Sequence, residues 1–325
     1  MRKEMFSSEN NWYKGNLHSH TTNSDGKLTP QRAVELYRQY GYHFMCLSEH
    51  DYYTDLRDEF DSDTFILLPG VEASALLVNK EKNAIIKTHH IHGILGNKAM
   101  QEAAGELVLK HGERLERPIY VENWDGAQVA QQLSDYLQER GCFTTYNHPI
   151  WSRVDMDEVS SLQGIWAIEV FNYGTEVECG EGQDTAFWNE MLRKGTHIHG
   201  FASDDNHNPG IFFDSFGGYV MVNAAELSHE AIVNALLEGD FYFSGGPQIY
   251  QWGVDGNCVF VECSEVERIN FIVGGPVGRS ETLMHHEVPL RGGFHTLRGD
   301  EKYVRIECVD DRGRKAWTNV LWLEE

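Results

Sequence analysis

Residues 16–26 read Asn-Leu-His-Ser-His-Thr-Thr-Asn-Ser-Asp-Gly, which places two histidines one residue apart and an aspartate five residues later. Side chains at alternate positions of an extended strand point to the same face. His18 and His20 can therefore direct two imidazoles at one point. The Ser-Asp-Gly that follows is typical of a turn, which brings the carboxylate of Asp25 back toward that point. Imidazole and carboxylate groups bind metal ions, so the stretch predicts a metal site.

More histidines and carboxylates accompany apolar runs of strand length. The runs and their polar groups are 42–48 with Glu49, His50 and Asp51; 65–68 with Glu72; 84–95 with His89, His90 and His92; 142–146 with His148; 165–171 with Asn172; and 197–202 with Asp204, Asp205 and His207. Helical patterns at 30–41, 126–140 and 186–194 separate many of these runs. This alternation is typical of parallel β/α units, which build active sites at the C-terminal ends of their strands.

The pattern changes beyond about residue 227. A helical pattern at 228–237 is followed by short alternating stretches at 258–261, 269–273, 303–309 and 317–323, with turn clusters between them. Such a series predicts a small antiparallel β domain of the sandwich type. We therefore expect an α/β domain at 1–247 and a β domain at 248–325. The second domain is expected to cover one face of the first or to form the contact of a homo-oligomer.

The formal net charge of the 325 residues is −23, which disfavours binding to nucleic acid and to anionic membranes. An anionic substrate stays open, because bound divalent cations would reverse the sign locally. The six cysteines form no C-x-x-C pair, which is typical of free thiols in a reducing compartment. No stretch approaches the length of an apolar membrane span, and residues 1–16 contain no apolar leader core. We expect a soluble, cytoplasmic protein.

The metal-binding residue types also indicate which ions would bind. Imidazoles mixed with carboxylates suit Zn, Mn or Fe better than Ca or Mg, which prefer oxygen ligands alone. The set of ligands exceeds what one tetrahedral ion needs. Two to three divalent ions are therefore expected, with Glu72 available to bridge them.

The ordered motifs resemble the PHP (polymerase and histidinol phosphatase) superfamily of metal-dependent phosphoesterases. The matching segments are Leu-His-Ser-His-Thr-Thr-Asn-Ser-Asp-Gly at 17–26, Leu-Ser-Glu-His-Asp at 47–51, Pro-Gly-Val-Glu at 69–72, His-Ile-His-Gly at 90–93, Asn-His-Pro at 147–149 and Ser-Asp-Asp-Asn-His at 203–207. The resemblance implies a distorted (β/α)7 barrel with a trinuclear site at the C-terminal strand ends. Segments 148–153 and 244–247 also look like those of stand-alone members that carry a small C-terminal β domain.

The resemblance further implies which residues hold each ion. The ligand sets are His18, His20, Glu72 and Asp205 for the first ion, Glu72, His90 and His148 for the second, and Asp25, His50 and His207 for the third. Two positions keep an alternative, because His92 shares a strand face with His90 and Asp204 precedes Asp205.

Three further residues are expected to contact the substrate. Arg153 is a candidate phosphate clamp, because a guanidinium pairs bidentately with phosphate oxygens. Asp51 follows a ligand directly, and Asn172 lies at a strand end. The remaining histidines, such as His43 and His111, are expected to be structural or to lie at the surface.

The expected activity is hydrolysis of a small phosphate mono- or diester, a phosphoesterase of the EC 3.1 class. Metal coordination lowers the pKa of water from about 15.7 to near 7, which supplies a hydroxide at neutral pH. Glu72 and Asp205 would hold the ions, and His207 would help the leaving oxygen depart. The same site could instead hydrolyse an amide, carbamate or carboxyl ester, and a metal-dependent binding protein is a third reading.

Overall fold

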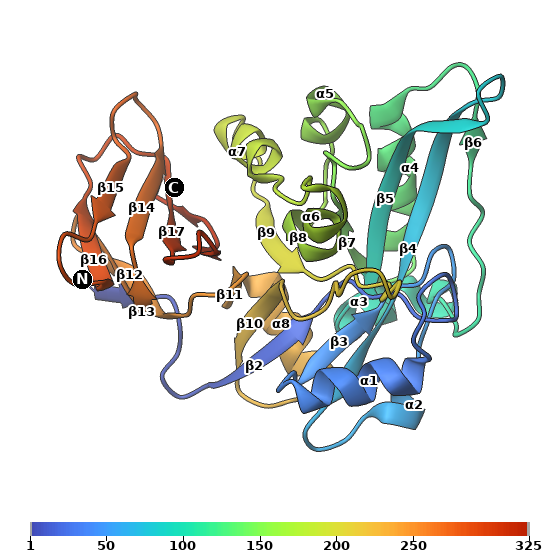
Figure 1. The fold of residues 1–325 in the computed structure, drawn as a ribbon, viewed down its shortest axis with the longest axis horizontal. Coiled ribbons are helices and arrows are strands. Elements are labelled where there is room, and N and C mark those ends of the chain that lie inside the picture. The colour runs from blue at the N-terminus through green and yellow to red at the C-terminus, as the bar shows by residue number, and fades with distance from the viewer. Residues whose placement is uncertain (1, 324–325) are drawn as a thin grey trace.

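The computed structural model describes residues 2–323, which fold into a mixed α/β structure (Figure 1). Its first nine strands are β1 (Arg2–Glu4), β2 (Asn11–Asn16), β3 (Phe44–Leu47), β4 (Ile66–Asn79), β5 (Ala84–Leu95), β6 (Ile119–Tyr120), β7 (Cys142–Tyr146), β8 (Ala167–Asn172) and β9 (His199–Ser203). The described helices are α1 (Pro30–Gln39), α2 (Arg57–Phe60), α3 (Lys98–Ala104), α4 (Gly126–Gln138), α5 (Met156–Ser160), α6 (Tyr173–Cys179), α7 (Thr185–Arg193) and α8 (His229–Glu238), with a 3-10 turn at Gly105–Leu107.

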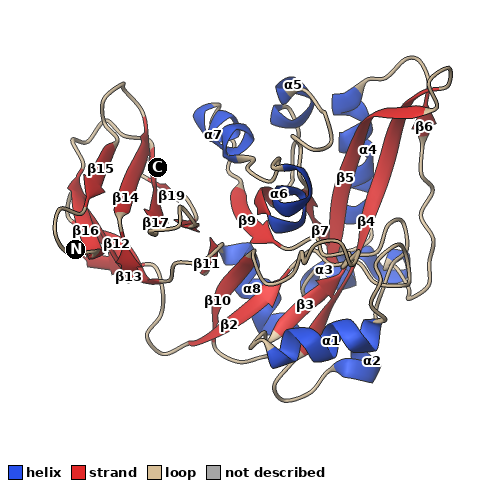
Figure 2. Ribbon diagram, in the orientation of Figure 1, coloured by secondary structure: helices blue, strands red, loops and turns tan. Residues whose placement is uncertain are grey.

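The later strands, shown with the others in Figure 2, are β10 (Tyr219–Ala224), β11 (Phe241–Ser244), β12 (Ile249–Asp255), β13 (Cys258–Val266), β14 (Arg268–Gly274), β15 (Glu281–Met284), β16 (Leu290–Thr296), β17 (Tyr303–Val309), β18 (Lys315–Thr318) and β19 (Leu321–Trp322). None of the helices between residues 2 and 323 combines the length and the apolar composition that crossing a membrane requires.

The central part of the large sheet has the strand order β2-β3-β4-β5-β7-β8-β9. Neighbours are parallel from β2 to β4 and from β7 to β9, but β5 runs antiparallel to both β4 and β7. The expected series of parallel strands therefore needs a correction at β5, which returns from β4 through a short turn without a helix. Beyond the strand ends, Ser19 pairs with Asn206, so the segments after β2 and after β9 are also joined.

Local sequence explains the central elements. Every residue of β3 and β7 is buried, and neither strand alternates polar with apolar residues, since strands covered on both faces lose that alternation. The helix α1 begins as expected, because the Thr29 side chain accepts a hydrogen bond from the Arg32 amide and Pro30 occupies the first turn. In Figure 1, α4 packs along β5 and β7, and α8 packs on β10.

The C-terminal strands form two antiparallel layers at one side of the molecule (Figure 1). One layer has the order β1-β12-β13-β16, so the N-terminal strand joins it. The other contains β15, β14, β17 and β18, and β18 pairs with β11, which makes this layer continuous with the large sheet. A cluster of buried side chains that includes Trp252, Val261, Phe271 and Ile306 packs in this region.

Candidate metal centre

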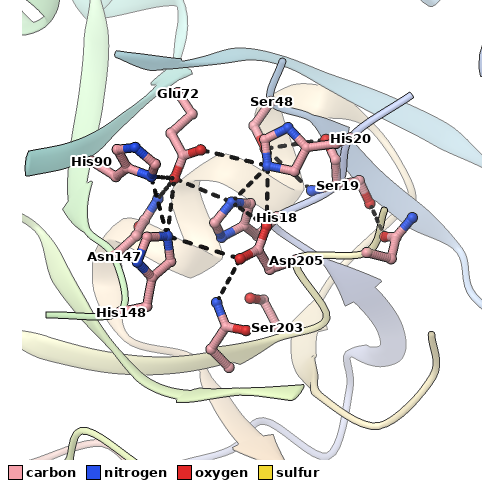
Figure 3. A network of polar contacts seen from close by, with 12 residues as sticks. His18, Ser19, His20, Ser48, Glu72, His90, Asn147, His148, Ser203 and Asp205 are labelled. Carbon is pink, nitrogen blue, oxygen red and sulfur yellow. Dashed lines mark hydrogen bonds and ion pairs between the residues drawn. The ribbon is translucent and has the colours of Figure 1, made fainter. Parts of the chain in front are cut away.

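The predicted ligands lie at one end of the central strands. His18 and His20 follow β2, His50 follows β3, His148 follows β7 and Asp205 follows β9. Glu72 and His90 instead lie inside β4 and β5, and the antiparallel pairing of these strands brings His90 opposite Ser74, close to Glu72. Figure 3 shows that His18, His20, His90 and His148 converge on the carboxylate of Glu72.

The first group of ligands surrounds the imidazole nitrogens of His18 and His20. Nε2 of His18 lies 3.0 Å from Nε2 of His20 and 3.0 Å from Oδ1 of Asp205. Nε2 of His20 lies 3.1 Å from the same Asp205 oxygen, and Oε1 of Glu72 lies 3.2 Å from Nε2 of His18. The structure thus brings together the four residues expected to hold the first ion.

Glu72 faces a second group through the same carboxylate. Its Oε1 lies 3.3 Å from Nδ1 of His90 and 3.4 Å from Nε2 of His148, and these two nitrogens are 3.4 Å apart. These are the three residues expected around the second ion. Glu72 therefore contacts both groups through one carboxylate oxygen.

The third group lies nearer to solvent. Oδ1 of Asp25 is 3.4 Å from Nε2 of His207, and Oδ2 of Asp25 is 3.6 Å from Nε2 of His50. His20 belongs to this group as well, since its ring nitrogen lies within 4.8 Å of the ligand atoms of the other three. The three groups therefore share ligands and form one cluster.

The donor atoms fit divalent ions. Within residues 2–323, Oε2 of Glu72, Oδ1 of Asp205 and Nδ1 of His50 are buried without a hydrogen-bond partner. Nδ1 of His50 and Oε2 of Glu72 are 2.9 Å apart, but they are not aligned as a hydrogen bond. Buried polar atoms without partners cost free energy. Lone pairs of nitrogen and oxygen that converge in this way match the ligands of a divalent metal ion.

Burial and charge act against each other in this cluster. Burial acts to raise the pKa of the Glu72 carboxyl, but the surrounding imidazoles hold that pKa well below its usual range. Burial acts to lower the pKa of His18, but the neighbouring carboxylates raise it well above its usual value. Burial, together with two nearby imidazoles, lowers the pKa of His20 to about 3. Metal ions would replace the protons on such histidines, because only the neutral imidazole binds a metal.

The two histidines left open on β5 occupy different depths. Nδ1 of His90 lies 3.3 Å from Glu72, and His90 lines the cleft that leads to the cluster. Nε2 of His92 lies 3.8 Å from Glu72, and its fully buried ring packs edge-on against His18 with 4.2 Å between centroids. His90 is therefore the nearer ligand for an ion reached from the cleft, and His92 lies behind it.

The adjacent aspartates point in different directions. Asp205 reaches the cluster, and its backbone has a positive φ of 50°. Functional sites often retain a strained backbone of this kind. Asp204 accepts hydrogen bonds from Tyr37 and from the backbone amides of residues 216–218. Burial raises the pKa of Asp204 to about 6 against the effect of these hydrogen bonds. Asp204 therefore positions a loop, and Asp205 is the candidate ligand.

A buried carboxylate that the sequence analysis did not select supports the ligands. Glu169, in β8, accepts a hydrogen bond from the His148 amide at 3.0 Å and from Asn172 Nδ2 at 2.9 Å, and its Oε1 lies 3.0 Å from Nδ1 of His18. A carboxylate on the second nitrogen of a ligand histidine fixes its ring and its tautomer. The sequence did contain a signal for Glu169, because it is the charged residue inside the apolar run 165–171.

The three residues expected to contact substrate take different places. Asn172 is fully buried behind the cluster, where its amide donates to Asp205 at 3.0 Å and its Oδ1 caps α6. Asp51 is also buried, and its carboxylate accepts hydrogen bonds from the Ser74 amide and from Nε of Arg117. Only Arg153 lies at the surface of a cleft, where it pairs with Glu181 at 2.9 Å. The sequence signal at strand ends did not distinguish cleft residues from the supports behind them.

A cleft of about 270 Å³ opens onto the cluster. Asp25, His50, His90, His148, Asp205 and His207 form its metal-binding side. Trp151, Pro209 and Phe212 contribute apolar walls, and Trp151 packs edge-on against His148 with 5.1 Å between ring centroids. A small ligand can therefore reach the cluster from solvent.

No protein-family model matches the chain, and no curated protein matches it. Among solved structures, it is similar to a two-domain protein from Bacteroides vulgatus described as containing a predicted PHP-like metal-dependent phosphoesterase, with 16% identity, a TM-score of 0.47, and coverage of 98% of this chain and 99% of the other. A protein from Bifidobacterium adolescentis, provisionally described as a metal-dependent phosphoesterase, has 15% identity, a TM-score of 0.37, and coverage of 61% and 89%. An amidohydrolase from Chromobacterium violaceum has 15% identity, a TM-score of 0.42, and coverage of 70% and 96%. One of these structures thus has a description that names the family whose motifs the sequence resembles.

Proposed function

We propose that the chain is a PHP-type phosphoesterase that hydrolyses a small phosphate mono- or diester with two to three divalent ions held by this cluster. The observation that carries the proposal is the position of Glu72, whose carboxylate lies within 3.5 Å of ring nitrogens of His18, His20, His90 and His148. A carboxylate shared in this way would hold ions close enough to act together on one ester.

The residues would divide the work as follows. Bound divalent ions supply a low-pKa water and neutralise the charge of phosphoryl oxygens. Glu72 and Asp205 would hold the ions, and Glu169 and Asn172 fix ligand side chains from behind. His207, which is 30% exposed at the side of the cleft, would stabilise the leaving oxygen.

We also propose the accompanying architecture. The series from β2 to β9, joined through Ser19 and Asn206, would be the distorted (β/α)7 barrel in which β5 is reversed. Residues 1–247 would form the catalytic domain and residues 248–325 the second domain, to which β1 contributes one strand.

The test combines metal content with turnover. We expect the purified protein, reconstituted with Mn, Fe or Zn, to bind two to three ions by elemental analysis and to hydrolyse an aryl phosphate. Glu72→Gln is expected to lose at least one ion and to lower turnover by about 1000-fold or more, in the range of other essential groups. Glu190→Gln, on the surface of α7, is the matched control and keeps both properties.

The outcome decides between the readings. Wild-type turnover by a folded Glu72→Gln variant would overturn the proposal. Hydrolysis of aryl esters or anilides without hydrolysis of any phosphate ester would assign the same centre to carbonyl chemistry. Metal binding without hydrolysis of either class would favour a binding protein.

A further inference from the structure

A second cleft adjoins the metal cleft and has a different character. Its volume is about 430 Å³, and it shares Asp25, His50, His90 and Trp151 with the first cleft. Its remaining lining includes Lys87, Arg117 and Arg153. Three cations in one cleft are unexpected in a chain with a net charge of −23. Such a cation can bind an anionic ligand where carboxylates of the protein do not already occupy its donor groups.

The three cationic side chains differ in how many of their nitrogens already pair with carboxylates of the protein. Nζ of Lys87 contacts both Asp155 and Glu158, and it lies 2.9 Å from the Glu158 carboxylate. An Nη atom of Arg153 lies 2.9 Å from Glu181. Arg117 uses only its Nε, which donates to Asp51.

Arg117 therefore keeps its terminal nitrogens for a ligand. Among residues 2–323, no hydrogen bond joins Nη1 or Nη2 of Arg117 to another group, and the side chain is 43% exposed. The Asp51 carboxylate that holds Nε is itself fixed, since its Oδ1 accepts the Ser74 amide at 2.7 Å. This contact orients the guanidinium and leaves its outer edge open, the arrangement that binds a carboxylate or phosphate bidentately.

The segment that carries Arg117 is fixed on both sides. The Leu115 amide donates to the Asp51 carbonyl and the Tyr53 amide donates to the Glu113 carbonyl, both at 2.9 Å. After Arg117, the Pro118 carbonyl accepts the Leu76 amide at 2.9 Å, and β6 pairs with β4. Arg117 thus stands at a set position beside the strands that carry the metal ligands. The segment between β5 and α4 supplies this residue.

We propose, on the basis of the phosphoesterase function proposed above, that this second cleft binds an acidic group at the far end of the substrate through Arg117. The reacting ester would lie at the metal cluster, and the acidic group would be a carboxylate or a second phosphate. Leu76, Ile85 and Ile86 also line the cleft, so an aliphatic spacer suits the path between the two ends. The substrate class is a phosphate ester whose alcohol part carries a terminal anionic group.

Calorimetric titration of the Mn-loaded protein tests this without relying on turnover. The probes are 4-phosphonobutanoate and 1,4-butanebisphosphonate, each compared with butylphosphonate, which lacks the second charge. We expect both doubly anionic probes to bind at least about tenfold more tightly than butylphosphonate, as a charge-assisted contact predicts. The probe with the larger preference identifies the acidic group.

Variants assign the preference to Arg117. We expect Arg117→Gln to abolish it while leaving butylphosphonate affinity unchanged, and Arg117→Lys to restore part of it. Arg114→Gln is the matched control, because Arg114 lies three residues away and stacks on Tyr52 instead of lining the cleft. Equal affinities in the wild-type protein, or a preference that survives in Arg117→Gln, would overturn the proposal.

A second probe pair separates this proposal from the phosphoesterase function. Hydroxamates chelate metal centres whatever bond the enzyme cleaves, so succinyl hydroxamate is compared with butyryl hydroxamate. If the phosphonates do not bind but the carboxylated hydroxamate binds more tightly through Arg117, the anion site stands and the phosphoesterase function fails. If the hydroxamates bind equally and 1,4-butanebisphosphonate binds no more tightly than butylphosphonate, the anion site fails. If no probe of either kind binds, both proposals fail.

Discussion

Nδ1 of His18 lies 3.0 Å from Oε1 of Glu169, although the two residues are 151 positions apart in the chain. Both side chains are fully buried. The opposite nitrogen of the same ring faces the first metal-binding group, so Glu169 sets the direction in which His18 presents its ligand atom. The same carboxylate receives the backbone amide of His148. One residue in β8 therefore positions ligands from two other strands.

Replacing Glu169 with glutamine tests this positioning role. We expect Glu169→Gln to keep the fold but to weaken metal affinity by about 10- to 100-fold, since the amide is a weaker partner for the His18 ring. Competition with a chromophoric chelator measures the affinity. Glu190→Gln should leave it unchanged. Unaltered affinity in Glu169→Gln would mean that other contacts orient His18.

Replacing Asp204 should mainly lower stability, whereas replacing Asp205 should mainly abolish metal binding. Asp204→Ala removes the acceptor for Tyr37 and three backbone amides, so we expect the free energy of unfolding to fall by about 3 kcal/mol while metal stoichiometry is kept. Asp205→Ala should lose metal without a comparable loss of stability in the chelated protein. Urea unfolding and elemental analysis of both variants separate the roles, and the reverse result would identify Asp204 as the ligand.

We expect His199 to make the free energy of unfolding depend on pH in the acid range. Burial lowers the pKa of His199 to about 4, against hydrogen bonds to Asn319 and Leu237 that act to raise it. Because the unfolded histidine has a pKa near 6.5, the unfolded state takes up a proton first as the pH falls. The free energy of unfolding should therefore drop by about 2 kcal/mol between pH 7.5 and pH 5 from this residue alone.

The variant His199→Gln should lack that part of the pH dependence. Urea unfolding of chelator-treated wild-type and variant proteins at both pH values isolates it, because all other titrating groups are shared. Parallel pH profiles for the two proteins would show that His199 is not a buried neutral base.

Removal of metal should destabilise the protein measurably. Ions that bind only the folded state add stability, by about 2.7 kcal/mol for an ion present at 100 times its dissociation constant. We expect a chelator to lower the melting temperature of the reconstituted protein by about 5 °C or more. The shift should be smaller in Glu72→Gln, which lacks the bridging carboxylate. A melting temperature that does not respond to chelator would contradict a structural contribution of the ions.

The sequence predicted local elements well where periodicity and caps are local properties. The helix predicted at 126–140 is confirmed as Gly126–Gln138, and the strands predicted at 142–146 and 303–309 are confirmed at those bounds. Strand direction was not predictable in the same way. The run at 84–95 reads as a strand in either direction, and only the hydrogen bonds with β4 and β7 make β5 antiparallel. The pairing of β1 with β12 likewise joins residues some 250 positions apart, which local patterns do not encode.

By itself, the sequence determined which imidazole and carboxylate groups are candidates for the cluster. The spacing of His18 and His20 and the polar groups after apolar runs are local features that follow strand geometry. Only the tertiary structure decided which member of each pair faces the cluster, since His90 and His92 share one face of β5 and differ in depth. It also decided that Glu169 supports His18 and that Asp51 holds Arg117 at the second cleft. These contacts join distant segments, and burial in the folded chain fixes which partners meet.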